Sequence, residues 1–303
     1  MSNVLQFHEV VRAYQPGVPV LNGVTFAAAE GEVVGLLGRN GAGKTTLIRI
    51  ALGMLHPQSG EVRVFGVHPL DDPVAVKKRI GYVAEEQMLP RRSSVAELIA
   101  FHRYLFPSWD ERMARDLLDR FQLPERARIG RLSKGEARQV ALLCAVCHRP
   151  ELLLLDEPAS GLDPAARREF LEVSIQLLNR EGSTILFSSH YMNDVERIGE
   201  RIVLLDEGKV RIDAAMDRLR EDFCLALAPD VAVESAALLE NVPGCMRARL
   251  VGDEWHAVFQ GDAADVQKRL SASLGRNSLR CVRLPLEELF VELLGGCQAW
   301  ERP

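Results

Sequence analysis

The sequence lacks any hydrophobic run that approaches the roughly 18 residues needed for a transmembrane helix. Its first nine residues contain neither the basic region nor the apolar core of a secretion signal. It also lacks a strong excess of charge of either sign, because the formal net charge is only −5. This argues against a general nucleic-acid-binding surface. We therefore expect a cytoplasmic chain, which would need another subunit to hold it at a membrane.

Cysteine is scarce: the 303 residues contain six. The scattered positions predict reduced thiols in an intracellular protein. Cys144 and Cys147 form a C-x-x-C within an apolar, helix-like run at 140–147, and His148 follows directly. No second pair follows at a spacing typical of metal sites. We favour buried helix cysteines over the alternative of metal or redox chemistry.

Length and composition indicate a folded protein with more than one compact part. Hydrophobic residues make up 47% of the chain and charged residues 26%, which is typical of globular proteins. The length predicts a large domain with a small one, or two of similar size. Arginines between positions 112 and 131 alternate with acidic residues, as on a solvated helical face, so nucleic acid is not an expected partner.

The most informative segment is a glycine-rich loop at residues 38–46 that ends in a lysine and two threonines. It fits the phosphate-binding pattern G-x-x-x-x-G-K-[ST], between a strand-like run at 33–37 and a helix-like run at 46–52. Glycines let backbone N–H groups crowd around phosphate oxygens, and the helix dipole favours negative charge there. Lys44 would neutralise the β- and γ-phosphates, and the Thr45 hydroxyl would ligate Mg²⁺. The sequence therefore predicts a nucleoside triphosphate bound by Gly38, Asn40, Gly41, Gly43, Lys44, Thr45 and Thr46.

Two adjacent carboxylates follow a run of four leucines at 152–155. In a nucleotide site, Asp156 would hold the metal ion, and Glu157 would accept a proton from the attacking water. An apolar strand that ends in two acids is a weak signal by itself, but together with the phosphate-binding loop it predicts hydrolysis. The catalytic residues predicted on these grounds are Glu157 and Lys44.

Alternating strand-like and helical patterns predict an α/β fold with a mostly parallel sheet. The expected strands of this sheet are 33–37, 152–155, 184–188 and 201–206, and those of a smaller antiparallel layer beside it are 4–10, 24–28 and 61–65. Residues 94–148 are mostly helical in pattern and predict an inserted helical subdomain. We expect this large domain to span residues 1–215.

The pattern of strand-like and helix-like runs changes after residue 215, and residues 216–303 predict a small α+β domain. Strands at 223–228, 246–251, 254–259 and 279–284, with helices at 233–240 and 263–274, give the order βαββαβ of a ferredoxin-like module. Gly252 and Asp253 form a two-residue hairpin turn between the middle strands. A last amphipathic helix is expected at 286–294.

Further motifs in a fixed order make residues 4–215 resemble the ATP-binding subunit of an ABC transporter, which has a P-loop NTPase core. Residues 132–136 (LSKGE) resemble the signature motif, 160–163 (SGLD) the D-loop and 188–190 (SSH) the switch histidine. The resemblance implies ATP and Mg²⁺ as cofactors and His190 as a catalytic contact to the γ-phosphate. It adds Tyr14, stacked on adenine, and Ser133, Gly135 and Asp163, which act across a dimer interface.

Two departures from the family pattern bear on chemistry. The glutamine expected after residues 80–84 is Glu85, which can ligate Mg²⁺ but cannot donate the hydrogen bond of an amide at neutral pH. The signature motif has Lys134 for a glycine and Glu136 for a glutamine. Lys134 either adds attraction for the γ-phosphate or is simply solvated. These changes, and the tail at 284–290, are similar to exporter-type subunits with separately encoded permeases.

The resemblance implies that two copies, or one copy and a paralogue, bind two ATP molecules head to tail. Hydrolysis would drive a membrane permease from the cytoplasmic face of the membrane, through a surface around residues 87–95 that includes Leu89, Pro90 and Val95. Two alternatives remain: a soluble ABC ATPase acting on ribosomes or nucleic acid, and a nucleotide-gated regulator with little turnover. The chain has one cassette, no heptad arm and no zinc-type cysteine set, which favours transport.

Overall fold

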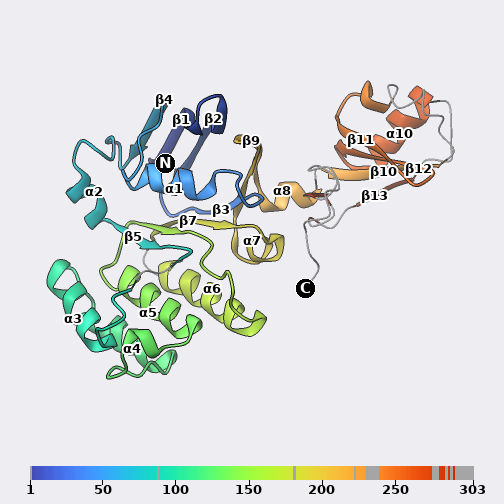
Figure 1. The fold of residues 1–303 in the computed structure, drawn as a ribbon. Coiled ribbons are helices and arrows are strands. Elements are labelled where there is room, and N and C mark those ends of the chain that lie inside the picture. The colour runs from blue at the N-terminus through green and yellow to red at the C-terminus, as the bar shows by residue number, and fades with distance from the viewer. Residues whose placement is uncertain are drawn as a thin grey trace. The chain divides into compact units, whose positions relative to one another are not determined.

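The computed structural model describes residues 2–86, 89–179, 182–221, 223–229, 239–274, 280–283, 286 and 289–290. The chain divides into two compact units, residues 1–213 and 214–303 (Figure 1). The sequence places the expected domain boundary two residues later, where strand β9 ends.

A six-stranded sheet forms the centre of the first unit. Its strand order is β5-β6-β7-β3-β8-β9, and the pairs from β5 to β8 are parallel. Strands β3, β6 and β7 are buried at every position, as expected for a parallel sheet that is covered on both faces. The six strands are β5 (Ile80–Val83), β6 (Leu152–Leu155), β7 (Thr184–Ser189), β3 (Val33–Leu37), β8 (Arg201–Asp206) and β9 (Lys209–Ala215).

A three-stranded antiparallel sheet and helix α1 (Lys44–Ala51) cover one face of this centre (Figure 1). The strand order is β2-β1-β4, with β2 at Val18–Ala29, β1 at Asn3–Gln15 and β4 at Ser59–Val64. One hydrophobic core joins both sheets, because Leu47 and Ile48 of α1 pack in a cluster with Leu5 of β1 and Leu36 of β3. The strands predicted for this layer all occur.

Helices α5 (Lys134–Val146), α6 (Pro164–Asn179) and α7 (Met192–Ile198) lie on the opposite side of the sheet (Figure 1). The predicted helical region at 94–148 contains α3 (Val95–Leu105), α4 (Glu111–Arg120), the short 3-10 helix Ile129–Arg131 and α5. It connects β5 to the adjacent strand β6, so it is an insertion between two neighbouring strands. A further short helix, α2 (Pro73–Lys78), precedes β5.

The C-x-x-C pair lies in the buried part of α5 and at its C-terminal cap. Burial raises the pKa of the Cys144 thiol to about 12 and also raises the pKa of Cys147. Within the described residues, no cluster of three potential ligands forms a metal site. The two cysteines therefore pack as small apolar side chains.

The second unit contains a four-stranded antiparallel sheet in the order β11-β12-β10-β13. This is the strand order expected for a ferredoxin-like βαββαβ chain. Gly252 has a φ of 63° in the turn between β11 and β12, as the predicted hairpin requires. The elements are α8 (Met216–Glu221), β10 (Phe223–Pro229), β11 (Cys245–Val251), β12 (Glu254–Gln260), α10 (Ala263–Leu274) and β13 (Arg280–Arg283).

The unit has its own hydrophobic core, in which Val266 and Leu270 of α10 pack with Trp255 and Phe259 of β12. The predicted helices at 233–240 and 286–294 lie largely outside the described residues. Among the helices that the structure describes, none has the length and apolar character of a membrane span.

Candidate active site

The loop between β3 and α1 has a backbone that only glycine can follow at several positions. Gly41 and Gly43 have positive φ angles of 84° and 105°, in the region that other residues rarely adopt. A Cβ atom on Gly43 would lie 2.9 Å from the Val20 carbonyl oxygen, and one on Gly38 would lie 2.4 Å from that of Leu205. The glycines therefore keep the loop closed against β2 and β8, with the N-terminus of α1 facing the site.

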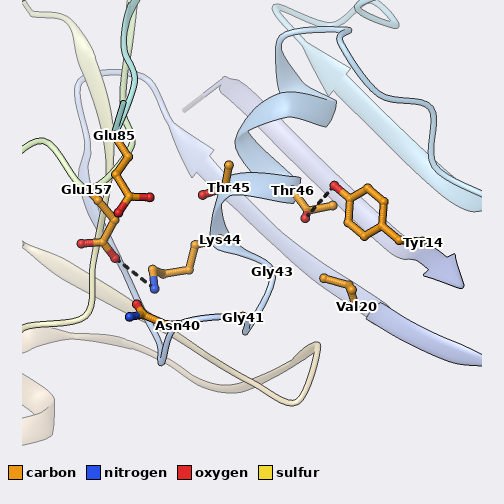
Figure 2. Close-up of a pocket in the computed structure, with 10 residues that line it drawn as sticks. All are labelled: Tyr14, Val20, Asn40, Gly41, Gly43, Lys44, Thr45, Thr46, Glu85 and Glu157. Carbon is orange, nitrogen blue, oxygen red and sulfur yellow. Dashed lines mark hydrogen bonds and ion pairs between the residues drawn. The ribbon is translucent and has the colours of Figure 1, made fainter. Parts of the chain in front are cut away.

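A cavity of about 300 Å³ opens above this loop (Figure 2). Most of its lining was predicted from the sequence. Val20 of β2 was not, because an apolar residue in a strand carries no chemical signal. The lining residues are Tyr14, Val20, Asn40, Gly41, Gly43, Lys44, Thr45, Thr46, Glu85 and Glu157.

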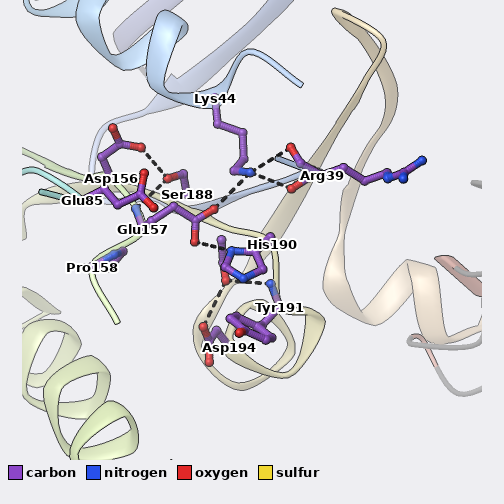
Figure 3. Close-up of polar contacts among 12 residues, drawn as sticks. Arg39, Lys44, Glu85, Asp156, Glu157, Pro158, Ser188, His190, Tyr191 and Asp194 are labelled. Carbon is purple, nitrogen blue, oxygen red and sulfur yellow. Dashed lines mark hydrogen bonds and ion pairs between the residues drawn. The ribbon is translucent and has the colours of Figure 1, made fainter. Parts of the chain in front are cut away.

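Lys44, Glu157 and His190 form a connected chain of charged and polar groups (Figure 3). The Lys44 ammonium lies 3.0 Å from Glu157 Oε1 and donates hydrogen bonds to the carbonyl oxygens of Gly38 and Arg39. Glu157 Oε2 lies 2.8 Å from His190 Nδ1. Both Lys44 and Glu157 are 5% exposed, so the pair is shielded from water. Sequence position alone could not show that Lys44 is already paired with the predicted base.

The surroundings of Glu157 keep its carboxylate ionised. Burial by itself raises the pKa, but the hydrogen bond from His190 and the positive charge of Lys44 outweigh it, and the net pKa lies below the usual range. The residue has a φ of 45°, and its backbone N–H donates to Ser188 Oγ at 2.8 Å. The side chain thus projects from a fixed, left-handed turn directly after β6.

Asp156 lies where a metal ligand is expected. Its Oδ1 accepts hydrogen bonds from the hydroxyl groups of Thr45 at 3.0 Å and Ser188 at 2.9 Å. Burial raises the pKa of Asp156 despite these two hydrogen bonds. A buried carboxylate, a hydroxyl and the Glu85 carboxylate in the cavity lining are oxygen donors of the type that Mg²⁺ prefers. The residues present therefore fit the predicted metal.

Tyr14 lies at the open end of the cavity, and its side chain is 54% exposed. Its hydroxyl lies 3.3 Å from Thr46 Oγ1, and Figure 2 shows the ring beside α1. The Arg12 guanidinium lies over one face of the ring, 5.5 Å from the centroid. The stacking of this ring on adenine stays a prediction of the family resemblance.

Five predicted nucleotide contacts are not among the residues that line this cavity: Gly38, Ser133, Gly135, Asp163 and His190. Ser133 caps α5, and its Oγ accepts a hydrogen bond from the Glu136 N–H at 3.2 Å. Glu136 Oε2 in turn accepts a hydrogen bond from the Ser133 N–H at 2.7 Å. Glutamate, like the glutamine of the signature motif, can form this reciprocal capping box, and its S-x-x-E pattern is visible in the sequence. Asp163 caps α6 through a hydrogen bond from Ala166 N.

Two polar residues of the site, Ser188 and Arg138, were not predicted individually from the sequence. Ser188 was identified only as part of the SSH motif, although its hydroxyl joins Asp156 to the backbone of Glu157. Arg138, two residues beyond the signature segment, donates hydrogen bonds to the carbonyl oxygens of Glu85, Glu157 and Pro158. No motif indicated it, because the contacts exist only after α5 packs against β5.

Known proteins resemble this chain in both sequence and fold. The family described as ABC transporter matches residues 21–160. Nod factor export ATP-binding protein I of Rhizobium meliloti (strain 1021) is 42% identical over 285 residues, which cover 91% of this chain and 84% of the relative. ABC transporter ATP-binding protein YtrB of Bacillus subtilis (strain 168) is 29% identical over 285 residues, covering 94% and 96%. A solved structure of an ATP-binding subunit of an ABC transporter gives a TM-score of 0.65 at 29% identity, covering 72% and 92%.

The chain therefore belongs to the ATP-binding proteins of ABC transporters. It is an ATPase subunit of an ATP-driven transporter, as its motifs predict. This membership favours transport over the alternative of a soluble ATPase acting on ribosomes or nucleic acid.

Proposed function

We propose that this chain hydrolyses ATP with Mg²⁺ in the described cavity and thereby powers an exporter through a separate membrane permease. The observation that carries the proposal is the connected chain of Lys44, Glu157 and His190 beside a phosphate-binding loop. It supplies a cation for phosphate oxygens, a carboxylate for a water proton and an imidazole at the position of the γ-phosphate.

Hydrolysis joins water to the γ-phosphorus and breaks the bond from that phosphorus to the bridging oxygen of ADP. Glu157 accepts a proton from the attacking water, for which its lowered pKa keeps it ionised. The Lys44 ammonium leaves its ion pair with Glu157 and pairs with the phosphate oxygens instead. His190 contacts the γ-phosphate. Thr45, Asp156 and Glu85 are the proposed ligands of Mg²⁺, which neutralises phosphate charge when bound.

A second subunit completes the proposed site. Ser133, Gly135 and Asp163 are not among the residues that line the cavity, and by resemblance to the family we assign their contacts to ATP to another copy or a paralogue. ATP that touches both subunits favours the closed pair, because it makes those contacts only there. Hydrolysis removes the bridge, and the subunits separate.

The proposed permease docks at the groove between α2 and α3, and this chain then lies at the cytoplasmic face of the membrane. The groove has a volume of about 370 Å³ and is lined by Pro73, Val74, Lys77, Lys78, Leu105 and Phe106. Tyr104 beside it is 85% exposed. Within the surface expected at 87–95, Pro90, Arg91 and Arg92 are exposed, Val95 is fully buried, and Gln87 and Met88 lie outside the described residues. Export is supported by the relatives named Nod factor export proteins.

The role of the site is tested by two substitutions in the full chain. Glu157→Gln should bind ATP at least as tightly as the unmodified chain but lower steady-state turnover by about 10²- to 10⁴-fold, because the general base is removed. Lys44→Ala should weaken ATP binding by about tenfold or more, because a buried cation is lost from the phosphate site. Turnover by Glu157→Gln at the level of the unmodified chain would exclude the assigned base.

The partner is tested by purifying the protein from its native membranes in mild detergent. A polytopic membrane protein at near-equal stoichiometry is the expected result. The variant Tyr104→Glu should lose this partner while its ATP affinity stays unchanged, because a charge is introduced beside the apolar groove. Recovery of ribosomal proteins or nucleic acid without a membrane protein would contradict the transport proposal.

A further inference from the structure

Arg138 is a half-buried side chain of α5 for which the proposed reaction has no task. Its guanidinium donates hydrogen bonds to backbone carbonyl oxygens rather than to a carboxylate. One nitrogen, Nη1, lies 2.9 Å from Glu157 O and 2.5 Å from Pro158 O, and Nη2 lies 2.6 Å from Glu85 O. One side chain thus joins the helix of the signature segment to the two loops that carry Glu157 and Glu85.

The pKa of the Arg138 guanidinium also reflects the nearby carboxylates of the site. Burial lowers the pKa of its guanidinium, and the negative charges of Glu85 and Glu157 oppose that shift. The cation is therefore held among carbonyl oxygens with both site carboxylates nearby. Three acceptors in a fan suit the planar guanidinium, whereas a lysine ammonium acts as a point donor and cannot match the same arrangement.

The contact to Glu157 bears on the direction of its carboxylate. Glu157 has a φ of 45°, a conformation in which non-glycine residues persist only when their surroundings hold them. Its N–H is held by Ser188 of β7 at 2.8 Å, and its carbonyl by Arg138 of α5 at 2.9 Å. Both backbone groups of the proposed base are thus held from outside its own loop, and its carbonyl also accepts a hydrogen bond from the Ser160 N–H within the loop at 3.1 Å.

We propose that Arg138 is a positioning residue for ATP hydrolysis, which holds the backbone of Glu157 so that its carboxylate faces the attacking water. The inference rests on the proposed role of Glu157 as the general base. Because Arg138 lies in the helix that Ser133 caps and also holds the Glu85 loop, the orientation of the helical region sets the position of the base. Arg138 itself is not among the residues that line the nucleotide cavity.

Substitution of Arg138 should separate turnover from nucleotide binding. In the full chain, Arg138→Gln should lower kcat by about ten- to a hundredfold, because a misplaced catalytic group is costly. Arg138→Lys should give a smaller loss, because a positive charge remains. The ATP dissociation constant, measured by calorimetry, should stay unchanged in both. Arg115→Gln, the same change on the exposed side of α4, is the matched control and should retain full turnover.

A double-mutant cycle tests whether Arg138 acts through Glu157. In the Glu157→Gln background, adding Arg138→Lys should leave the residual rate nearly unchanged, because there is no carboxylate to position. Independent losses that multiply, weaker ATP binding in parallel with kcat, or full turnover by Arg138→Gln would each overturn the inference. Full turnover by Glu157→Gln alone would instead contradict the assignment of Glu157 as the general base. That outcome is distinct from a failure of the role proposed for Arg138.

Discussion

At the scale of single residues, the two adjacent carboxylates of the site have opposite properties. Burial raises the pKa of Asp156, although the hydroxyls of Ser188 and Thr45 oppose the shift. Burial acts on Glu157 in the same sense, but His190 and Lys44 overcome it and lower the pKa. The difference arises from the partners: hydroxyls for Asp156, an ammonium and an imidazole for Glu157. The proposed metal ligand and the proposed proton acceptor are thus distinguished by neighbours rather than by residue type.

The raised pKa of Asp156 predicts a pH-dependent stability difference. The folded chain binds the Asp156 proton more tightly than the unfolded chain does, so this group's contribution to stability falls as pH rises from the usual carboxyl range through the raised pKa. Without Mg²⁺, Asp156→Asn should become progressively more stable relative to the unmodified chain over that range. Urea unfolding of both proteins at a series of pH values measures this, and a constant difference would contradict it.

Much of the site was predictable because its motifs are short segments at strand ends. Lys44 and Thr45 begin α1 after the glycine-rich loop that follows β3, Asp156 and Glu157 follow β6, and His190 follows β7. The carboxyl ends of parallel strands meet at one edge of a sheet, so these residues converge. Val20 and Arg138 were not predictable, since each reaches the site through packing between elements that are distant in sequence.

At the scale of elements, the signature segment combines a structural cap with a proposed binding role. The capping box of Ser133 and Glu136 starts α5, and an equivalent box of Ser94 and Glu97 starts α3. Glu136 has a lowered pKa because of its hydrogen bonds with Ser133. The cap is therefore formed at neutral pH and is weakened as pH falls through that lowered pKa.

The two capping boxes provide a matched comparison. Ser133→Ala and Ser94→Ala should each destabilise the fold by about 1 kcal/mol, because each removes an N-cap oxygen. Only Ser133→Ala should also reduce ATP turnover, since Ser94 has no proposed contact with nucleotide. Urea unfolding and steady-state ATPase assays distinguish the two effects. Equal turnover in both variants would remove Ser133 from the proposed second half of the site.

Element boundaries were predictable where hydrophobic runs are continuous and less so elsewhere. The four leucines of β6 and the run at β3 were located to the residue. Strand β1 extends to Gln15, beyond the predicted end at Val10, because its pairing with β2 continues through several register shifts. Such irregular pairing leaves no simple alternation in the sequence.

At the scale of the whole chain, the two units have separate hydrophobic cores. Residues 1–215 include every residue of the nucleotide cavity and end with strand β9. We therefore expect a chain of residues 1–215 to fold and to bind ATP with the affinity of the full chain. Calorimetric titration of both proteins tests this. A marked loss of affinity in the shorter chain would mean that the second unit contributes to the site.

The ion pair between Lys44 and Glu157 places an internal carboxylate in competition with the phosphates of ATP for the same ammonium group. The Lys44 ammonium pairs with the Glu157 carboxylate at 3.0 Å, so a phosphate that pairs with this lysine must displace an internal anion. The base is thereby released by the same ligand that it then helps to cleave. Glu157→Gln removes the competing carboxylate and should therefore tighten ATP binding while turnover is lost. Binding weaker than in the unmodified chain would show that the ion pair does not oppose the binding of nucleotide.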